Sequence, residues 1–190
     1  MKKATQVFIA GSRRLSRLSK EVQRRIDNIT QNRFMILIGD ANGVDKAVQE
    51  YLDKKHYRQV RVFCMEGKPR NNVGQWETES VEANDKTRKD FAYFSAKDRA
   101  MAREANYGLM LWDGESRGTF ENVVDLIRQE KPVVVYVSEN NHFFTLRDSQ
   151  TLREMLRRVA PSKLRNLEND FGVVVRGGSS EQLRDPNALL

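Results

Sequence analysis

Residues 109–122 read LMLWDGESRGTFEN, and this stretch decides the fold. Four apolar residues are followed by a turn with two glycines and then by a segment with helical apolar spacing. A strand that enters a helix through such a turn brings unpaired backbone N–H groups and the positive helix end to one point. Arg117 adds a forked cation there. The stretch therefore predicts an anion site, most simply for phosphate. The alternative is an ordinary loop with a hydroxyl cap and a solvated arginine.

The same strand–turn–helix pattern recurs along the chain. Continuous apolar runs, typical of parallel strands covered on both faces, occur at 7–10, 34–38, 60–64, 108–112 and 133–137. Helical apolar spacing occurs at 19–31, 44–52, 95–105, 120–127 and 152–159. Ser95 and Asp98 suggest a capping box for the third helix. These alternations predict an α/β fold, a Rossmann-like doubly wound parallel sheet of about five strands with a C-terminal helix and tail.

The composition favours one domain without a membrane segment. The chain has 190 residues and a net charge of +7, which permits binding of nucleic acid or acidic ligands without proving either. No apolar run approaches the length of a membrane span, and the run after the basic start is too short for a signal peptide. Cys64 is the single cysteine, and its apolar neighbours predict a buried thiol. We expect a cytoplasmic protein.

Two parts of the chain fall outside the repeating pattern. Residues 65–94 have no sustained period and form a long insert. Trp76, within it, either stacks on a base or, as we favour, pins the loop to the body of the protein. We place the end of the Rossmann-like domain at residue 138, followed by a helix and a partly flexible tail in 139–190. Residues 171–175 (FGVVV) are interpreted as an extra edge strand or a subunit contact.

Three turns with glycine follow predicted strands, at 11–13 (GSR), 39–43 (GDANG) and 114–119 (GESRGT). Ligands bind outside the carboxyl ends of the strands in open α/β sheets, so we expect these turns to converge at one edge. None contains the dinucleotide motif GxGxxG or the P-loop ending Gly-Lys-Ser/Thr. His56 and His142 are isolated, and we expect no structural zinc site and no cofactor. A magnesium ion accompanying a phosphate is left open.

The three turns together resemble the SLOG superfamily. This Rossmann-like group includes the cytokinin-activating phosphoribohydrolases (LOG proteins) and DNA-processing protein A, and the chain is most similar to its small YspA-like members. Residues 10–13 match their Ala-Gly-Ser-Arg pattern, and residues 112–119 match Trp/Phe-Asp-Gly-x-Ser-x-Gly-Thr in full. Residues 39–45 match Gly-Gly-Ala-x-Gly-x-Asp, with Asp40 in place of a glycine. The resemblance covers about residues 5–137, and the long insert within that span and the tail fall outside it.

This resemblance implies a nucleotide-like ligand whose phosphate is held by residues 116–119, with the other two turns at the floor of the pocket. The ligand-binding residues implied in this way are Gly11, Ser12, Arg13, Gly39, Asp40, Gly43, Asp45, Asp113, Gly114, Ser116, Arg117, Gly118 and Thr119. Oligomers are common in the superfamily, so a homodimer is compatible with the resemblance.

The residues that cleave the base–ribose bond in the LOG proteins are altered in this chain. Their glutamate follows the threonine of the turn by three residues, where this chain has Asn122, and Glu121 stands one position early. Their arginine and lysine precede a methionine by four and three residues, where this chain has Lys97 and Asp98; Arg99 is offset by two positions from the arginine. If the chain is an enzyme, Glu121, Lys97 and Arg99 are its candidate catalytic residues.

Three functions are therefore open. The first, which we favour, is a binding or sensor protein for a nucleoside monophosphate or an ADP-ribose- or NAD-derived ligand. The second is an N-glycosidic hydrolase of nucleoside 5′-monophosphates that uses Glu121, since a carboxylate can stabilise an oxocarbenium-like centre. The third is single-stranded DNA binding, as in DNA-processing protein A. It is less favoured because the sequence offers no platform that combines basic and aromatic residues.

Overall fold

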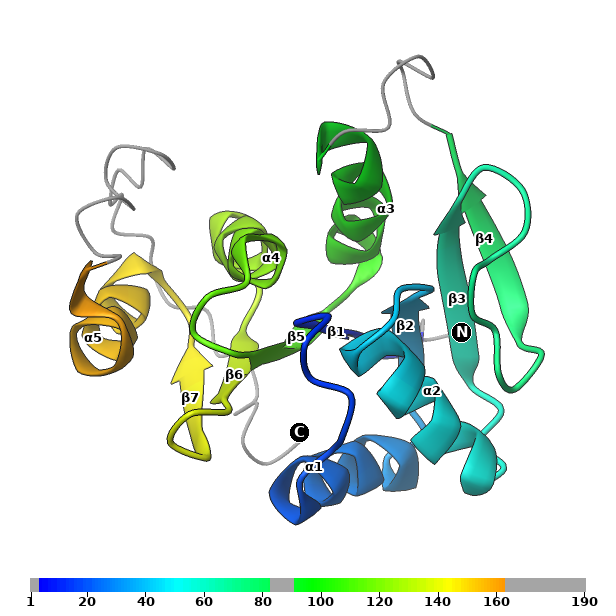
Figure 1. Ribbon diagram of the computed structural model, residues 1–190, viewed down its shortest axis with the longest axis horizontal. Helices are drawn as coiled ribbons and strands as arrows, with labels where there is room; N and C mark the ends of the chain where they lie inside the picture. Colours follow the sequence, from blue (N-terminus) through cyan, green and yellow to red (C-terminus); the bar gives the residue numbers. More distant parts are fainter. Residues whose placement is uncertain (1–3, 83–90, 163–190) are drawn as a thin grey trace.

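The computed structural model describes residues 4–82 and 91–162. These residues form a seven-stranded sheet with helices on both faces (Figure 1). The strands are β1 (Gln6–Gly11), β2 (Met35–Gly39), β3 (Val60–Met65), β4 (Glu77–Val81), β5 (Tyr107–Trp112), β6 (Val133–Val137) and β7 (His142–Leu146). The helices are α1 (Lys20–Gln31), α2 (Val44–Lys54), α3 (Phe91–Glu104), α4 (Arg117–Arg128) and α5 (Ser149–Val159).

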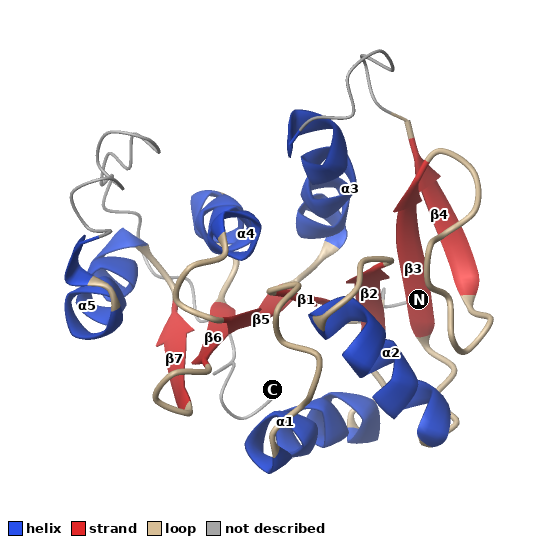
Figure 2. Cartoon of the chain, viewed as in Figure 1, coloured by secondary structure: helices blue, strands red, loops and turns tan. Residues whose placement is uncertain are grey.

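Two helical layers cover the sheet. Successive side chains of a strand point to opposite faces. Phe8 of β1 therefore packs with Met101 of α3 in a core that also includes α4 and α5. Its neighbour Ile9 packs on the other face with Ile26 of α1, in a core that includes α2. Figure 2 shows the same division, with α3, α4 and α5 on one side of the sheet and α1 and α2 on the other. The doubly wound α/β fold predicted from the sequence is confirmed.

The order of the strands creates a crevice next to β1. The sheet has the order β4-β3-β2-β1-β5-β6-β7, and β6–β7 is its single antiparallel pair among the described residues. The chain first adds β2, β3 and β4 on one side of β1 and then returns to place β5 on the other side. Gly11 pairs with Leu111, so the carboxyl ends of β1 and β5 lie level. An open sheet binds its ligands at such a reversal point.

All five predicted strands and all five predicted helices are present within four residues of their expected bounds. Cys64 is fully buried, as predicted. One detail was wrong: α3 begins at Phe91, so Ser95 lies inside the helix and does not form a capping box with Asp98. A helix cap needs non-helical backbone, which Ser95 lacks.

Two further strands extend the sheet at its edges. β4 lies within the predicted insert at 65–94 and pairs in parallel with β3. β7 follows β6 through a tight turn in which Asn141 has a φ of 50°. Edge strands have few buried side chains, and most of β4 and β7 is only partly buried or exposed. Neither strand therefore carries the continuous apolar run that revealed the other five.

The segments outside the predicted pattern also pack onto the body of the protein. Trp76 is buried, and its indole Nε1 donates a 2.8 Å hydrogen bond to the carbonyl of Tyr57, so the prediction that it pins the loop is confirmed. The predicted boundary at residue 138 falls between β6 and β7 of one sheet, and Leu152 of α5 shares a core with Phe8. The segment 171–175 and the predicted flexible tail lie outside the described residues. No helix within residues 4–82 and 91–162 is long and apolar enough to cross a membrane.

Candidate functional site

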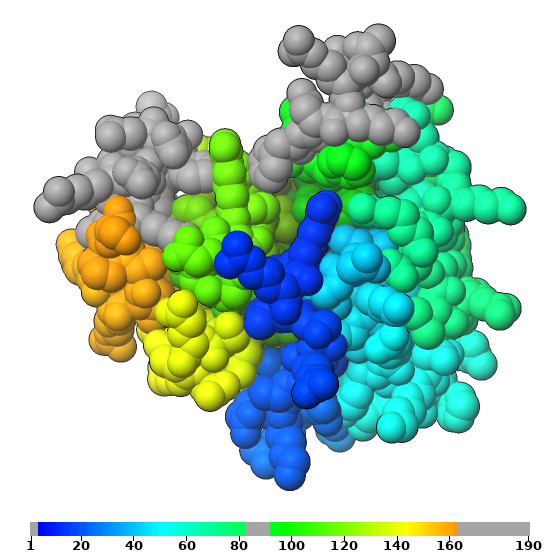
Figure 3. Space-filling view, in the orientation of Figure 1, coloured from blue at the N-terminus to red at the C-terminus, as the bar shows by residue number. Residues whose placement is uncertain are grey.

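A cavity of about 640 Å³ opens where β1 and β5 end. Its walls come from the loop after β1, the start of α2, the first half of α3, the loop after β5 and the start of α4. It is lined by Ala10, Gly11, Ser12, Arg13, Arg14, Ala41, Asp45, Phe94, Ser95, Lys97, Asp98, Asp113, Glu115, Ser116, Arg117, Gly118, Thr119 and Asn122. In the space-filling view the loop after β1, in blue, lies between the light-green α4 region and the light-blue α2 region (Figure 3).

Asp113 organises the loop between β5 and α4. Its Oδ1 accepts hydrogen bonds from the amides of Glu115, at 3.1 Å, and Ser116, at 2.7 Å. Its Oδ2 accepts a 2.6 Å bond from the Ser12 hydroxyl, which ties this loop to the loop after β1. Burial alone would raise the pKa of Asp113, but the bonds from Ser12 and the loop amides outweigh it and lower that pKa. Gly114 adopts a φ of 76°, which a residue with a side chain rarely does.

The first turn of α4 forms one wall of the cavity. Ser116 caps the helix, since its hydroxyl accepts a bond from the Thr119 amide at 3.4 Å. The remaining amides of a first helical turn have no partner within the helix, and the helix dipole makes this end positive. Arg117 is largely exposed, with 73% of its side chain accessible, and its Nε donates a 2.9 Å bond to Glu121. This wall is suited to hold an anion.

Glycines let the loops approach one another beneath the cavity. A Cβ on Gly11 would overlap the carbonyl of Leu111 in β5 and the side chain of Val44 in α2. A Cβ on Gly43, which has a φ of 81°, would overlap the backbone of Arg13. The amide of Val44 also donates to the carbonyl of Ser12 at 3.2 Å. These close contacts bring the ends of β1, β2 and β5 together.

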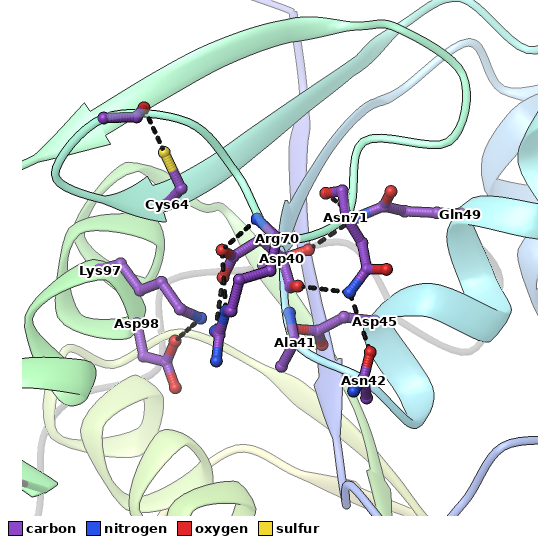
Figure 4. Close-up of polar contacts among 12 residues, drawn as sticks. Asp40, Ala41, Asn42, Asp45, Gln49, Cys64, Arg70, Asn71, Lys97 and Asp98 are labelled. Atoms are coloured by element: carbon purple, nitrogen blue, oxygen red, sulfur yellow. Dashed lines mark hydrogen bonds and ion pairs between the residues drawn. The ribbon is translucent and has the colours of Figure 1, made fainter.

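A buried ion cluster lies at the inner end of the cavity. Lys97, only 5% exposed, forms a 2.8 Å ion pair with Asp98 (Figure 4). Burial lowers the pKa of Lys97, but the charges of Asp98 and Asp45 outweigh burial and raise it. Asp45 accepts a 3.1 Å bond from the Ala41 amide. A Cβ on Gly39 would overlap the Asp45 carboxylate and lie 2.6 Å from Lys97 Nζ, so glycine leaves room for this cluster.

Burial raises the pKa of Asp45 to about 6, although the charge of Lys97 opposes that increase. Asn122 of α4 completes the cluster by donating a 3.2 Å bond to Asp98 Oδ2. The cluster thus brings charged and polar side chains of α2, α3 and α4 together beside the end of β2.

A second ion pair holds the loop between β3 and β4 beside this cluster. The Arg70 guanidinium donates to both carboxylate oxygens of Asp40, at 2.7 and 3.1 Å, and the Arg70 amide donates to the same group at 3.0 Å. Burial alone would raise the pKa of Asp40, but the bonds from Arg70 outweigh it and lower that pKa. The guanidinium groups of Arg70 and Arg13 lie 5.6 and 6.0 Å from the ring centroid of Phe94.

The structure brings ten of the residues named from the sequence together around the cavity, as its lining. They are Gly11, Ser12, Arg13, Asp45, Lys97, Asp113, Ser116, Arg117, Gly118 and Thr119. Gly39, Asp40, Gly43 and Gly114 lie behind this lining, where they shape or support it. Glu121 and Arg99 do not line the cavity: Glu121 pairs with Arg117, and Arg99 donates to the carbonyl of Ala92.

Several lining residues were not identified as ligand-binding from the sequence. Phe94, Ser95 and Asp98 lie on α3. The helix was predicted to begin at residue 95, four residues after its actual start, so the face of α3 that lines the cavity could not be assigned from the sequence. Asn122 follows Thr119 by three residues, so both lie on the same face of α4. That spacing was the signal available for Asn122. Among the described residues, no group of three or more His, Cys, Asp or Glu side chains is placed to hold a metal ion.

The architecture and the site define a Rossmann-like α/β protein with its cavity at the sheet reversal. Among solved structures, DNA processing protein A from Helicobacter pylori, studied for its single-stranded DNA binding mode, has a similar fold. The TM-score is 0.52, with 18% identity over 87% of this chain and 81% of that chain. No protein-family model matches the sequence, and no curated protein matches it either. This likeness supports the Rossmann-like α/β fold, whereas the resemblance to the SLOG superfamily and to its YspA-like members stays a prediction.

Proposed function

We propose that the chain binds a nucleotide-like phosphorylated ligand in this cavity, as a binding or sensor protein. One observation carries the proposal: most of the exposed charges in the lining are cations, with Glu115 the exception, and most of its less exposed charges are carboxylates. The cations Arg13, Arg14 and Arg117 are exposed at the mouth, beside the first turn of α4. The carboxylates of Asp45 and Asp98 lie at the inner end with Lys97. A ligand with a phosphate at one end and hydroxyl groups at the other fits this polarity.

The placement of the candidate catalytic groups favours binding over hydrolysis. Glu121 pairs with Arg117 outside the lining, and the neutral amide of Asn122 faces the cavity instead. Lys97 forms an ion pair with Asp98, and the nearby charge of Asp45 also stabilises its charged form, so the charge of Lys97 is already compensated. Hydrolysis would require Glu121 to leave Arg117 and approach the ligand.

A thermal-shift titration tests the proposal. Nucleoside monophosphates, NAD and ADP-ribose are added to the purified chain, and every stabilising compound is re-examined by mass spectrometry. A ligand of the folded state raises the midpoint as its concentration exceeds its Kd. We expect stabilisation by a phosphorylated compound that is recovered intact. Recovery of free base and sugar phosphate would establish the hydrolase instead, and no stabilisation by any of them would refute the proposal.

A matched pair of variants locates the phosphate. Arg117→Ala removes a cation at the cavity, whereas Arg128→Ala removes an exposed cation from the far end of the same helix. Loss of a hydrogen bond to a charged group weakens binding about tenfold or more. We expect that loss for Arg117→Ala alone. Equal effects of the two changes would mean that the net charge attracts the ligand without a defined phosphate site.

Single-stranded DNA is a second candidate ligand. The similar fold of DNA processing protein A favours it, as does the net charge of +7. A phosphate of the DNA backbone would then occupy the first turn of α4. Fluorescence anisotropy with labelled oligonucleotides at several salt concentrations tests this candidate. Saturation at a defined site size supports it, whereas binding that disappears steeply with salt and never saturates indicates nonspecific attraction.

A further inference from the structure

The inner end of the cavity presents a carboxylate with acceptor positions to spare. Asp98 is 23% exposed in its side chain and lines the cavity. Its Oδ1 accepts the 2.8 Å bond from Lys97, and its Oδ2 accepts the 3.2 Å bond from Asn122. An ionised carboxylate has about four acceptor positions, two on each oxygen. The bonds from Lys97 and Asn122 orient the group and leave one position on each oxygen for a ligand.

The other cavity carboxylates are less suited to meet a ligand. Asp113 uses three hydrogen bonds to hold its own loop and Ser12, so it is a structural group. Asp45 lines the cavity but is only 5% exposed, and one of its oxygens already accepts the bond from the Ala41 amide. Glu115 is exposed at the surface. Asp98 is therefore the carboxylate whose position and free capacity both suit contact with a bound molecule.

The charge of Asp98 selects what it can contact. A negative carboxylate repels a phosphate but accepts hydrogen bonds strongly from neutral hydroxyl groups. The phosphate end of a ligand is thus directed to the arginines and the first turn of α4. Asn122, which touches Asp98, lies three residues beyond Thr119, about 4.5 Å along the helix. A separation of this order suits a single sugar ring between the phosphate and Asp98.

We propose that Asp98, oriented by Lys97 and Asn122, binds the 2′,3′-diol of a ribose 5′-phosphate and so selects ribonucleotides over 2′-deoxyribonucleotides. This inference rests on the proposed function and names the sugar that the same cavity prefers. Sites built to hydrogen-bond a hydroxyl group reject the analogue that lacks it, because their polar groups are left unpaired. The expected preference is about tenfold or more, as for one hydrogen bond to a charged group.

Isothermal titration of AMP, GMP, CMP and UMP and of dAMP, dGMP, dCMP and dTMP tests the inference. For the wild-type chain we expect the ribonucleotide of each base to bind about tenfold or more tightly than its 2′-deoxy counterpart. The dTMP base carries a methyl group that the UMP base lacks, so the test rests on the pairs with adenine, guanine and cytosine. Asp98→Asn should bring the two affinities close together, mainly by weakening the ribonucleotide. Arg117→Ala should weaken both nucleotides and preserve their ratio. The ratio is measured on the same folded protein, so a partial loss of stability in Asp98→Asn does not affect it.

The outcomes separate the two proposals. Equal affinity for both sugars in the wild type refutes the diol site and leaves phosphate binding intact. If Asp98→Asn still binds ribonucleotides more tightly than 2′-deoxyribonucleotides, another residue makes the selection, and this result also overturns the inference. If no nucleotide of either kind binds, the proposed function fails, and the sugar site fails with it.

Discussion

Asp45 makes the stability of the protein depend on pH in a way that can be measured. Its side chain is only 5% exposed, and burial raises its pKa from an ordinary 3.8 to about 6, against the opposing charge of Lys97. Between these two pH values the folded chain holds a proton that the unfolded chain has lost. The free energy of unfolding therefore falls as the pH rises from about 4 through 6.

The expected size follows from the difference between the two pKa values. One pKa unit corresponds to about 1.36 kcal/mol, so ionisation of Asp45 removes about 3 kcal/mol of stability above pH 6. Domains of this size are stable by about 5–15 kcal/mol in total. Asp45→Asn keeps the shape of the side chain without the titration. Relative to the wild type, this variant should gain about 2 kcal/mol between pH 4 and pH 7, because part of the total change already falls below pH 4.

Urea unfolding of both proteins at pH 4, 5, 6 and 7 measures this difference. Taking the difference between the two cancels the titration of the other carboxylates, including Asp40 and Asp113. Glu50→Gln serves as the control for the loss of one negative charge, because Glu50 is an exposed carboxylate of the same helix. If the free energies of wild type and Asp45→Asn change in parallel over this range, Asp45 ionises as it does in the unfolded chain and the reasoning is wrong.

Three substitutions test the contacts that shape the site. Arg70→Met leaves the buried Asp40 carboxylate without its side-chain partner, and we expect urea unfolding to report a loss of about 2 kcal/mol; an unchanged midpoint would contradict this. Trp76→Phe removes the indole bond to the Tyr57 carbonyl and should cost about 1 kcal/mol, with faster proteolysis between β3 and β4; equal cleavage rates would argue against pinning. Ser116→Ala removes the cap of α4 and should cost about 1 kcal/mol in thermal unfolding, whereas Ser116→Gly should cost less.

Local sequence was sufficient to predict the central elements of this fold. Parallel strands buried on both faces must be apolar throughout, and the run at 133–137 follows that rule over its whole length. The turn at 114–119 was equally readable, because its glycines and its Ser116 cap act within a few residues of one another. These effects act between residues close in the chain, so they can be predicted from the sequence alone.

Edge strands, and ion pairs between residues far apart in the chain, could not be predicted from the sequence in the same way. β4 is defined by its hydrogen bonds to β3, and its side chains, from Glu77 to Val81, carry no apolar pattern. The arginine at position 70 was visible in the insert, but its partner Asp40 lies 30 residues earlier. No local rule connects two residues at that separation.

The sequence by itself determined the alternation of strands and helices, the buried faces, and the three turns that meet at one edge of the sheet. Only the tertiary structure decided which side chains face the cavity. In the folded protein Asn122 and Asp98 line the cavity and contact each other. Glu121, the neighbour of Asn122 in the chain, forms an ion pair with Arg117 instead. The physical reason is rotation: adjacent residues on a helix point about 100° apart, and the packing of α4 against α3 sets which of them faces the ligand.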